Sequence, residues 1–240
     1  MSVTVVDDAA LASTAADAVL ARLPQLRPRL GVATGGTPMR LYWELARRTR
    51  CGRIDRSAAV VVALDEYVGL GAGDPHSYAA YVHQRVVVPL AIALQNVVVP
   101  DGTAADPVVA AADFDARITA IGGVDVQIAG IGANGHLGFN EPGSPLDSAT
   151  RVVTLSERTR QDNARFFAGR LDAVPRQAIT QGLATIARAR AVVLLAFGSA
   201  KARPLAAALR GPVTPEVPAS VLQRHADVTV IADRAAAAML

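Results

Sequence analysis

Four polar side chains with potential for chemistry follow an apolar stretch at residues 124–131: Asn134, His136, Asn140 and Glu141. An imidazole titrates near neutral pH, and a nearby carboxylate can orient it for proton transfer. These residue types at this spacing predict an acid–base site. The alternative is a surface loop in which the histidine is incidental.

The same loop contains the pattern G-x-G-x-x-G at residues 130–135. Dinucleotide-binding folds use that pattern with a helix beginning inside the glycines. Residues 136–145 contain glycine, asparagine and proline, which resist helix formation. We therefore reject a dinucleotide-binding site at this loop.

An acidic pair, Asp65 and Glu66, ends the apolar stretch at residues 59–64. Neighbouring side chains of an extended chain point to opposite sides, so only one of the two is expected to face a ligand pocket. Burial beside an apolar cleft disfavours the charged carboxylate and raises its pKa toward values that suit a general base. The alternative is a solvated strand end.

A glycine-rich turn occupies residues 33–38, after an apolar stretch at residues 30–34. Its two glycines let backbone amides approach a ligand, and the helix expected at residues 38–47 points its positive end at the same place. Thr37 is expected to cap that helix, with Pro38 at its first position. The turn predicts a phosphate cradle that is not a P-loop. A simple tight turn is the alternative.

Lysine occurs once in the chain, as Lys201, just after an apolar stretch at residues 191–197. In the first turn of a helix it opposes the helix dipole by roughly 0.3–1 kcal/mol unless an anion binds there. A bound phosphate would supply that anion. A Schiff-base lysine and a solvated side chain are the alternatives.

Short β-branched stretches alternate with amphipathic helical ones along the chain. Continuous apolar runs such as residues 60–64 are typical of strands buried on both faces of a parallel sheet. The alternation predicts an α/β fold, a doubly wound, mostly parallel, Rossmann-like sheet with helices on both faces. Ligands in such folds bind beyond the carboxyl ends of the strands, where the four segments above lie.

The expected elements cover most of the chain. Strands are predicted at residues 30–34, 59–64, 96–99, 124–131, 151–155, 191–197 and 228–231. Helices are predicted at residues 11–20, 38–47, 77–87, 107–121, 156–167, 182–189 and 200–209.

Composition limits the classes of function. Hydrophobic residues make up 51% and charged residues 19% of the 240 residues, which is typical of a folded domain. The net charge of +3 comes with scattered arginines and only 4% aromatic residues, so we expect no nucleic-acid partner. No apolar run approaches the ~20 residues of a membrane span, and the single Cys51 suits a reducing cytoplasm. His76 and His83 lack a third ligand at suitable spacing, so no metal site is predicted.

Five segments, taken in order, resemble the glucosamine-6-phosphate deaminase family. They are residues 34–38 (Thr-Gly-Gly-Thr-Pro), 64–70 (Leu-Asp-Glu-Tyr-Val-Gly-Leu), 132–142 (Gly-Ala-Asn-Gly-His-Leu-Gly-Phe-Asn-Glu-Pro), 163–167 and 198–202. Each segment is modest alone, but the ordered set is specific and spans residues 2–233. The resemblance implies a single domain, 1–240, with a small mobile helical lid around residues 151–180.

The resemblance implies that glucosamine 6-phosphate and water are converted to fructose 6-phosphate and ammonia. Asp65 matches the base that moves a proton between C2 and C1 of the opened sugar. His136 matches the group that opens the ring, assisted by Glu141. Asn134 stands where some relatives carry aspartate, so it can orient His136 but carries no charge and is expected to shift the pH optimum.

Binding of the sugar phosphate is implied for a second set of residues: Thr34, Gly35, Gly36, Thr37, Arg165 and Lys201. The family's chemistry needs no covalent lysine, which weighs against a Schiff base, and we expect no cofactor. A small-molecule sugar phosphate is the expected partner. The oligomeric state stays open between a monomer and a small homo-oligomer.

Three rival functions follow from the same residues. Galactosamine 6-phosphate differs from the expected substrate only at C4, and the sequence leaves this choice open. The 6-phosphogluconolactonases share the fold, but residues 64–67 and 139–142 are much more similar to the deaminases. A non-catalytic sugar-phosphate sensor is disfavoured because base, histidine and carboxylate are all present.

Regulated relatives use a basic pair near the strand after the catalytic loop to bind N-acetylglucosamine 6-phosphate. Arg151 matches one member of the pair, but Val153 replaces the second cation. The longer tail of those relatives is also missing. We expect allosteric activation to be absent or weak.

Overall fold

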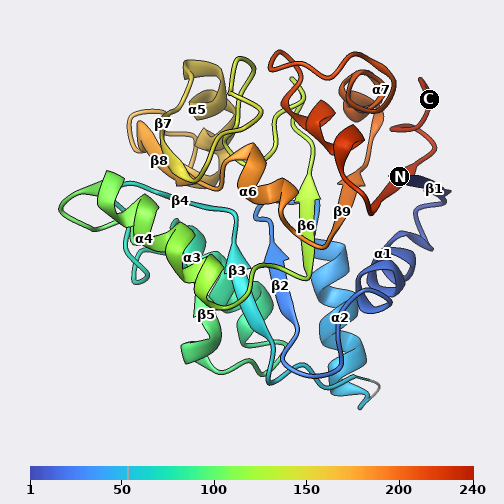
Figure 1. Cartoon of the computed structure of the whole chain (residues 1–240), viewed down its shortest axis with the longest axis horizontal. Helices are drawn as coiled ribbons and strands as arrows, with labels where there is room; N and C mark the ends of the chain where they lie inside the picture. Colours follow the sequence, from blue (N-terminus) through green and yellow to red (C-terminus); the bar gives the residue numbers. More distant parts are fainter. Residues whose placement is uncertain (53) are drawn as a thin grey trace.

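The computed structural model describes residues 1–52 and 54–240 and has a seven-stranded sheet at its centre (Figure 1). The strand order is β1-β10-β9-β6-β2-β3-β5, and neighbouring strands run parallel throughout. These strands are β1 (Ser2–Val6), β2 (Arg29–Val32), β3 (Val60–Ala63), β5 (Val97–Val98), β6 (Val126–Gly130), β9 (Ala191–Ala196) and β10 (Val228–Asp233). The predicted α/β fold with a mostly parallel sheet is confirmed.

Helices cover both faces of this sheet, because side chains of successive strand residues alternate between two apolar cores. Val61 packs in the core formed with α1 (Leu11–Leu20), α2 (Met39–Arg50) and the π-helical turn η1 (His83–Val87). Val62, the next residue, packs in the core formed with α4 (Pro107–Ala120), α6 (Leu183–Ala187) and α7 (Ala202–Arg210). The sheet is therefore doubly wound.

Local sequence signals explain where several helices begin. Ser77 precedes α3 (Tyr78–Val82), and its Oγ accepts a hydrogen bond from the Ala80 amide at 3.0 Å. Asp106 caps α4 in the same way, with Pro107 at the first helical position. The predicted cap at Thr37 is wrong, because α2 begins at Met39 and Pro38 occupies its cap position.

A second, three-stranded antiparallel sheet joins distant parts of the chain. Its order is β4-β8-β7, formed by β4 (Asp65–Tyr67), β7 (Arg151–Thr154) and β8 (Gln177–Thr180). The predicted strand at residues 151–155 exists, but it belongs to this sheet and not to the central one. β4 begins two residues after β3 ends, so the chain passes from one sheet into the other at Leu64.

The segment between β7 and β8 contains α5 (Glu157–Asn163) and the 3-10 turn η3 (Ala164–Phe167). Phe167 is buried in a small core with Tyr67 and Phe139. The remaining short turns are η2 (Leu94–Asn96), η4 (Ser199–Lys201) and η5 (Pro218–Arg224).

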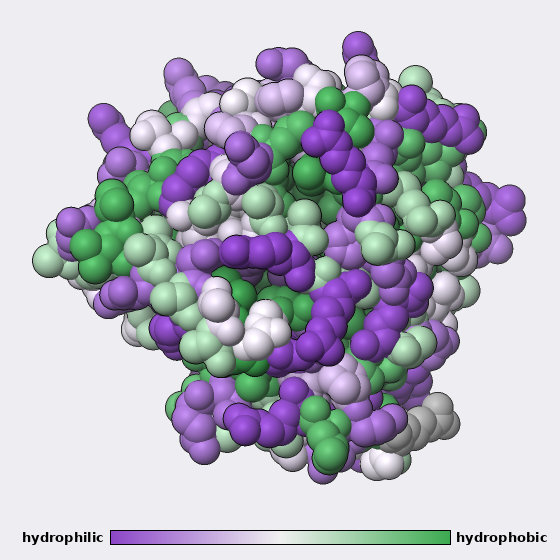
Figure 2. Space-filling model, viewed as in Figure 1, coloured by the Kyte–Doolittle hydropathy of each residue, from purple (hydrophilic) through white to green (hydrophobic). Residues whose placement is uncertain are grey.

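Hydrophilic side chains are spread over the face shown in Figure 2, interrupted by small apolar areas. None of the helices within residues 1–52 and 54–240 has the length and apolar character that a membrane span requires.

Candidate active site

A cavity of about 330 Å³ lies at the carboxyl ends of the central strands, beneath α5 and η3. Parallel α/β sheets place their ligands at this edge, because the loops that follow the strands converge there. The cavity brings together most of the sequence-predicted site residues: Thr34, Gly35, Gly36, Thr37, Asp65, His136, Arg165 and Lys201.

The two acidic residues after β3 face opposite ways, as the extended backbone predicts. Asp65 lines the cavity, whereas the Glu66 carboxylate accepts hydrogen bonds from the amides of Tyr78 at 2.9 Å and Ala79 at 2.8 Å at the start of α3. Only 4% of Asp65 is exposed, and its Oδ1 has no hydrogen-bond partner within the described residues. Burial, followed by the Glu66 charge, raises the pKa of Asp65 well above 3.8.

Gly138 makes room for this carboxylate. A Cβ at position 138 would lie 3.2 Å from Asp65 Oδ2 and 3.0 Å from Thr180 Oγ1, and its φ of +56° lies in the left-handed region. A glycine is therefore needed for both the backbone and the packing.

His136 is held in one tautomer by Asn134. Nδ1 of the imidazole lies 2.7 Å from Asn134 Oδ1, and the His136 backbone amide donates to the same oxygen at 3.3 Å. An amide oxygen only accepts hydrogen bonds, so the proton sits on Nδ1 and Nε2 is left to accept one. Burial and then the charge of Lys201 lower the pKa of His136, which favours the neutral ring.

Glu141 does not line the cavity, although its charge acts on His136. Its Oε1 accepts hydrogen bonds from Ser156 Oγ at 3.0 Å and from the Thr159 hydroxyl, two side chains at the start of α5. Its negative charge acts to raise the pKa of His136. Asn134 and Glu141 are thus the two predicted site residues that do not line the cavity, and both act on it through His136.

Two cations, Arg165 and Lys201, line the cavity together with the glycine-rich turn. Lys201 ends η4, just before α7, and Arg165 lies in η3, with its guanidinium 4.8 Å from the Phe166 ring centroid. Burial, and then the charge of Arg165, lower the pKa of Lys201. A bound anion would relieve this repulsion, so the arrangement suits a phosphate.

Several cavity residues were not predicted as site residues: Tyr78, Thr159, Asp162, Asn163 and Phe166. Most of them belong to α5 and η3. The spacing of Thr159, Asp162 and Arg165 places them on one helix face, and this signal is visible in the sequence. Asn163 Nδ2 donates to the Tyr67 hydroxyl at 2.9 Å, which ties α5 to β4.

The side chains within the described ranges form no cluster of three or more His, Cys, Asp or Glu that could hold a metal ion. The ionisable groups that line the cavity instead include the buried carboxylate of Asp65, a neutral imidazole, two cations and the carboxylate of Asp162. Such a set can transfer protons and bind a phosphorylated small molecule.

The chain is similar to known proteins over its whole length. A family model described as glucosamine-6-phosphate isomerases/6-phosphogluconolactonase matches residues 6–231. The glucosamine-6-phosphate deaminase of Streptomyces coelicolor is 48% identical, covering 100% of this chain and 93% of the relative. The Cutibacterium acnes protein of the same name is 51% identical, with 98% and 90% covered.

Solved structures agree with the sequence relatives. The structure of a monomeric glucosamine-6-phosphate deaminase matches with a TM-score of 0.95 and 37% identity, covering 100% of both chains. The 6-phosphogluconolactonase from Trypanosoma cruzi has a TM-score of 0.79 at 21% identity over 100% of this chain and 96% of its own, a likeness that shows the fold alone. On the family model and the full-length relatives together, the chain belongs to the glucosamine-6-phosphate isomerase/6-phosphogluconolactonase family.

Proposed function

We propose that the protein is a glucosamine-6-phosphate deaminase, which converts glucosamine 6-phosphate and water to fructose 6-phosphate and ammonia. The observation that carries this proposal is the shared cavity of Asp65, His136, Arg165 and Lys201. The cavity holds a buried carboxylate, a neutral imidazole and two cations that can bind an anion. Relatives of 48% and 51% identity with this name support the same reaction.

The phosphate anchors the substrate at the glycine-rich turn, between the backbone amides of residues 35–37 and the side chains of Arg165 and Lys201. This contact lies away from the reacting carbons. Its binding energy therefore orients C1 and C2 at the acid–base groups without taking part in the chemistry.

His136 opens the pyranose ring. With Nδ1 bonded to Asn134, Nε2 of the neutral ring takes the proton from the anomeric hydroxyl and returns it to the ring oxygen as the C1–O5 bond breaks. Glu141 stabilises the transient imidazolium by its charge. The product of this step is the open-chain aldehyde.

Asp65 then moves one proton from C2 to C1 of the opened sugar. Its carboxylate removes the proton from C2 while a proton of the substrate ammonium group passes to O1, which gives an enolamine, and the resulting carboxylic acid then protonates C1. The C2 imine formed in this way adds water and expels ammonia, leaving fructose 6-phosphate. A carboxylate with a raised pKa suits both halves of the transfer, because it must accept and return a proton.

The test is ammonia release from glucosamine 6-phosphate and galactosamine 6-phosphate by the wild type and by Asp65→Asn. We expect release from glucosamine 6-phosphate and a loss of roughly 10²–10⁴ in kcat for the variant, the usual contribution of one acid–base group. Phosphate binding should persist, since Asn keeps the size of the side chain. The wild-type activity should fall in acid at a pH well above 3.8, because the pKa of Asp65 is raised.

Hydrolysis of 6-phosphogluconolactone without ammonia release would refute the proposal in favour of a lactonase. Faster turnover of the galacto epimer would correct the substrate and leave the mechanism in place. An Asp65→Asn variant that deaminates at the wild-type rate would remove the assigned role of that carboxylate.

A further inference from the structure

A buried carboxylate outside the proposed mechanism fixes the first turn of α3. Glu66 is 1% exposed and accepts hydrogen bonds from the backbone amides of Tyr67 at 2.8 Å, Tyr78 at 2.9 Å and Ala79 at 2.8 Å. Burial raises its pKa to about 7, although these three donors act to lower it. The two donors from α3, Tyr78 and Ala79, hold the start of this helix against Glu66 of β4.

Tyr81, in the same short helix, reaches the glycine-rich turn. Its hydroxyl donates to the carbonyl of Gly35 at 2.7 Å and lies 3.0 Å from Met39 Sδ. The tyrosine thereby contacts both Gly35 within the turn and Met39, the first residue of α2. β4, α3 and the turn are linked by two sets of hydrogen bonds.

The bond from Tyr81 sets the plane of one peptide unit. The carbonyl of Gly35 and the amide of Gly36 belong to the same planar group and point in opposite directions. Fixing the carbonyl on Tyr81 therefore turns the Gly36 N–H away from Tyr81. Gly36 lines the candidate active-site cavity and Tyr81 does not.

The glycine turn needs such support. Gly35 has a φ of +91°, and within the described residues no atom lies within 4 Å of a Cβ built at Gly35 or Gly36. Nothing packs on these two positions from the side-chain direction. The hydroxyl of Tyr81 is the side-chain group that holds the Gly35 carbonyl.

We propose that Tyr81 and Glu66 are positioning residues for phosphate binding: Glu66 fixes α3, and Tyr81 aims the Gly36 amide at the substrate phosphate. This inference rests on the proposed function and deepens it, since it names what orients one of the donors. Asp65, the proposed proton-transfer carboxylate, and Glu66, the proposed positioning residue, are then neighbours in the sequence.

The direct test is Tyr81→Phe, which removes one hydroxyl and keeps the ring. Binding of inorganic phosphate is measured by calorimetry, and steady-state kinetics with glucosamine 6-phosphate are recorded beside it. We expect the Kd for phosphate to rise about two- to tenfold, the range of one net hydrogen bond. KM should rise with it, and kcat should fall less than KM rises, because the reacting carbons lie elsewhere.

Glu66→Gln tests the other half of the linkage. The amide group keeps one acceptor and brings a donor against the α3 amides, so the phosphate Kd should rise in this variant also. The loss of phosphate-binding free energy in the double variant should be smaller than the sum of the losses in the two single variants, because both residues act through the same bond to Gly35. Asp106→Asn is the matched control: it alters the cap of α4, none of whose residues lines the cavity, and should leave the phosphate Kd and KM unchanged.

The outcomes separate the two proposals. If the wild type deaminates and Tyr81→Phe binds phosphate as tightly as the wild type, the positioning role is wrong and the proposed function stands. If the wild type binds phosphate, loses affinity in Tyr81→Phe and yet releases no ammonia, the proposed function fails and the positioning role stands. A wild type that binds no phosphate, or an unfolded Glu66→Gln beside a Tyr81→Phe of normal affinity, overturns the inference.

Discussion

Nδ1 of His136 lies 2.7 Å from Oδ1 of Asn134, so an uncharged amide, and not a carboxylate, orients the imidazole of the cavity. The amide fixes the tautomer without stabilising the protonated ring. Burial and the charge of Lys201 then keep the pKa of His136 below its usual 6.5. The histidine is therefore neutral over a wider pH range than one paired with a carboxylate.

Asn134→Asp should raise the pKa of His136 by about 1–3, the usual effect of an adjacent opposite charge. An NMR titration of the imidazole signals measures it directly, and the signals of His76 and His225 serve as internal controls. The pH optimum of deamination should move to higher pH with the histidine, because more alkaline solution is needed to keep the ring neutral. An unchanged His136 titration would contradict the orientation described for the pair.

Gly132→Ala should displace the histidine ring. A Cβ at this position would lie 2.2–2.3 Å from three ring atoms of His136, so the ring must move. A displacement near 1 Å costs about 10²-fold in rate when a catalytic group is misplaced, and kcat for ammonia release should fall by that order. Gly130→Ala is the control, because its nearest atom, Thr37 Cβ, is 3.9 Å away. Equal losses of kcat in the two variants would show that activity depends on the backbone at the end of β6 and not on the position of the His136 ring.

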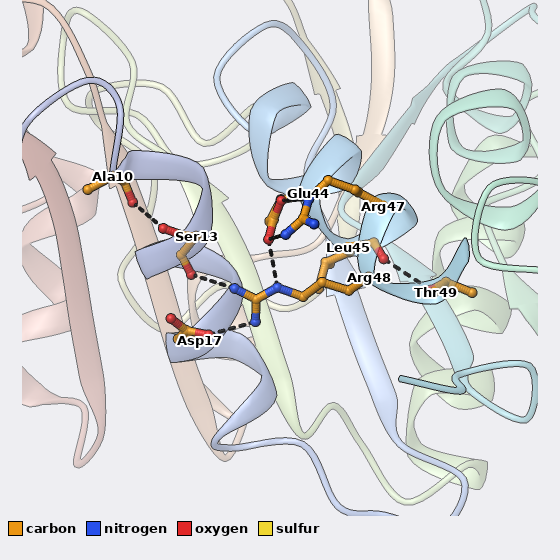
Figure 3. Close-up of polar contacts among 8 residues, drawn as sticks. All are labelled: Ala10, Ser13, Asp17, Glu44, Leu45, Arg47, Arg48 and Thr49. Carbon is orange, nitrogen blue, oxygen red and sulfur yellow. Dashed lines mark hydrogen bonds and ion pairs between the residues drawn. The ribbon is translucent and has the colours of Figure 1, made fainter. Parts of the chain in front are cut away.

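Arg48→Gln should destabilise the packing of α1 against α2. The Arg48 guanidinium bonds to Glu44 at 2.7 Å and to Asp17 at 2.6 Å, and so bridges the two helices (Figure 3). Only 14% of this side chain is exposed, so we expect a loss of about 1–3 kcal/mol in the free energy of unfolding, measured in urea. Arg50→Gln, an exposed change at the end of α2, should cost less than about 0.5 kcal/mol.

The effect of Arg48→Gln should depend on pH. Hydrogen bonds from Arg47, then from Arg48, lower the pKa of Glu44 from 4.5 to about 2, so the carboxylate stabilises the fold above pH 4.5 and loses this contribution as the pH falls toward 2. The difference in stability between wild type and variant should narrow over that range. A difference that stays constant down to pH 2 would exclude the ion pairs as its source.

N-acetylglucosamine 6-phosphate should not activate the enzyme. The Arg151 guanidinium is already bonded to Asn140 Oδ1 at 2.8 Å and Ser144 Oγ at 3.2 Å, and Val153 on the same strand offers no second cation. Initial rates against glucosamine 6-phosphate, with and without the N-acetyl sugar, should be hyperbolic and superimposable. Sigmoidal kinetics that the effector abolishes would prove this expectation wrong.

The chemistry at the strand ends was the most predictable part of the molecule. A parallel sheet brings its carboxyl-terminal loops to one edge, so Asp65, His136 and Lys201 could be assigned to a common region from their places after apolar runs. The opposite orientations of Asp65 and Glu66 also follow from the extended backbone alone.

The second sheet was less predictable, because its strands are short and pair over long separations. β4 has three residues, and its partner β8 lies more than 100 residues away with no long apolar run to mark it. β1 was missed for a related reason: Val3 and Val5 stay exposed at the sheet edge, so its pattern is not that of a buried strand. At Thr37, threonine before proline satisfied a capping rule, but α2 starts one position later than that rule requires.

The antiparallel sheet limits which residues can move over the cavity. β8 is hydrogen-bonded to both β4 and β7, and the Leu155 amide donates to the Arg176 carbonyl at 2.9 Å, so the two strands that flank the α5–η3 segment are bonded to each other and, through β8, to the strand that bears Asp65. The mobile lid expected around residues 151–180 stays a prediction; if it moves, the strand pairing favours motion of residues 156–175, and amide exchange should then be fastest inside those limits. Arg165 lies inside these limits, whereas Asp65 and His136 lie outside them, so such a motion would separate Arg165 from the two groups that we propose for proton transfer.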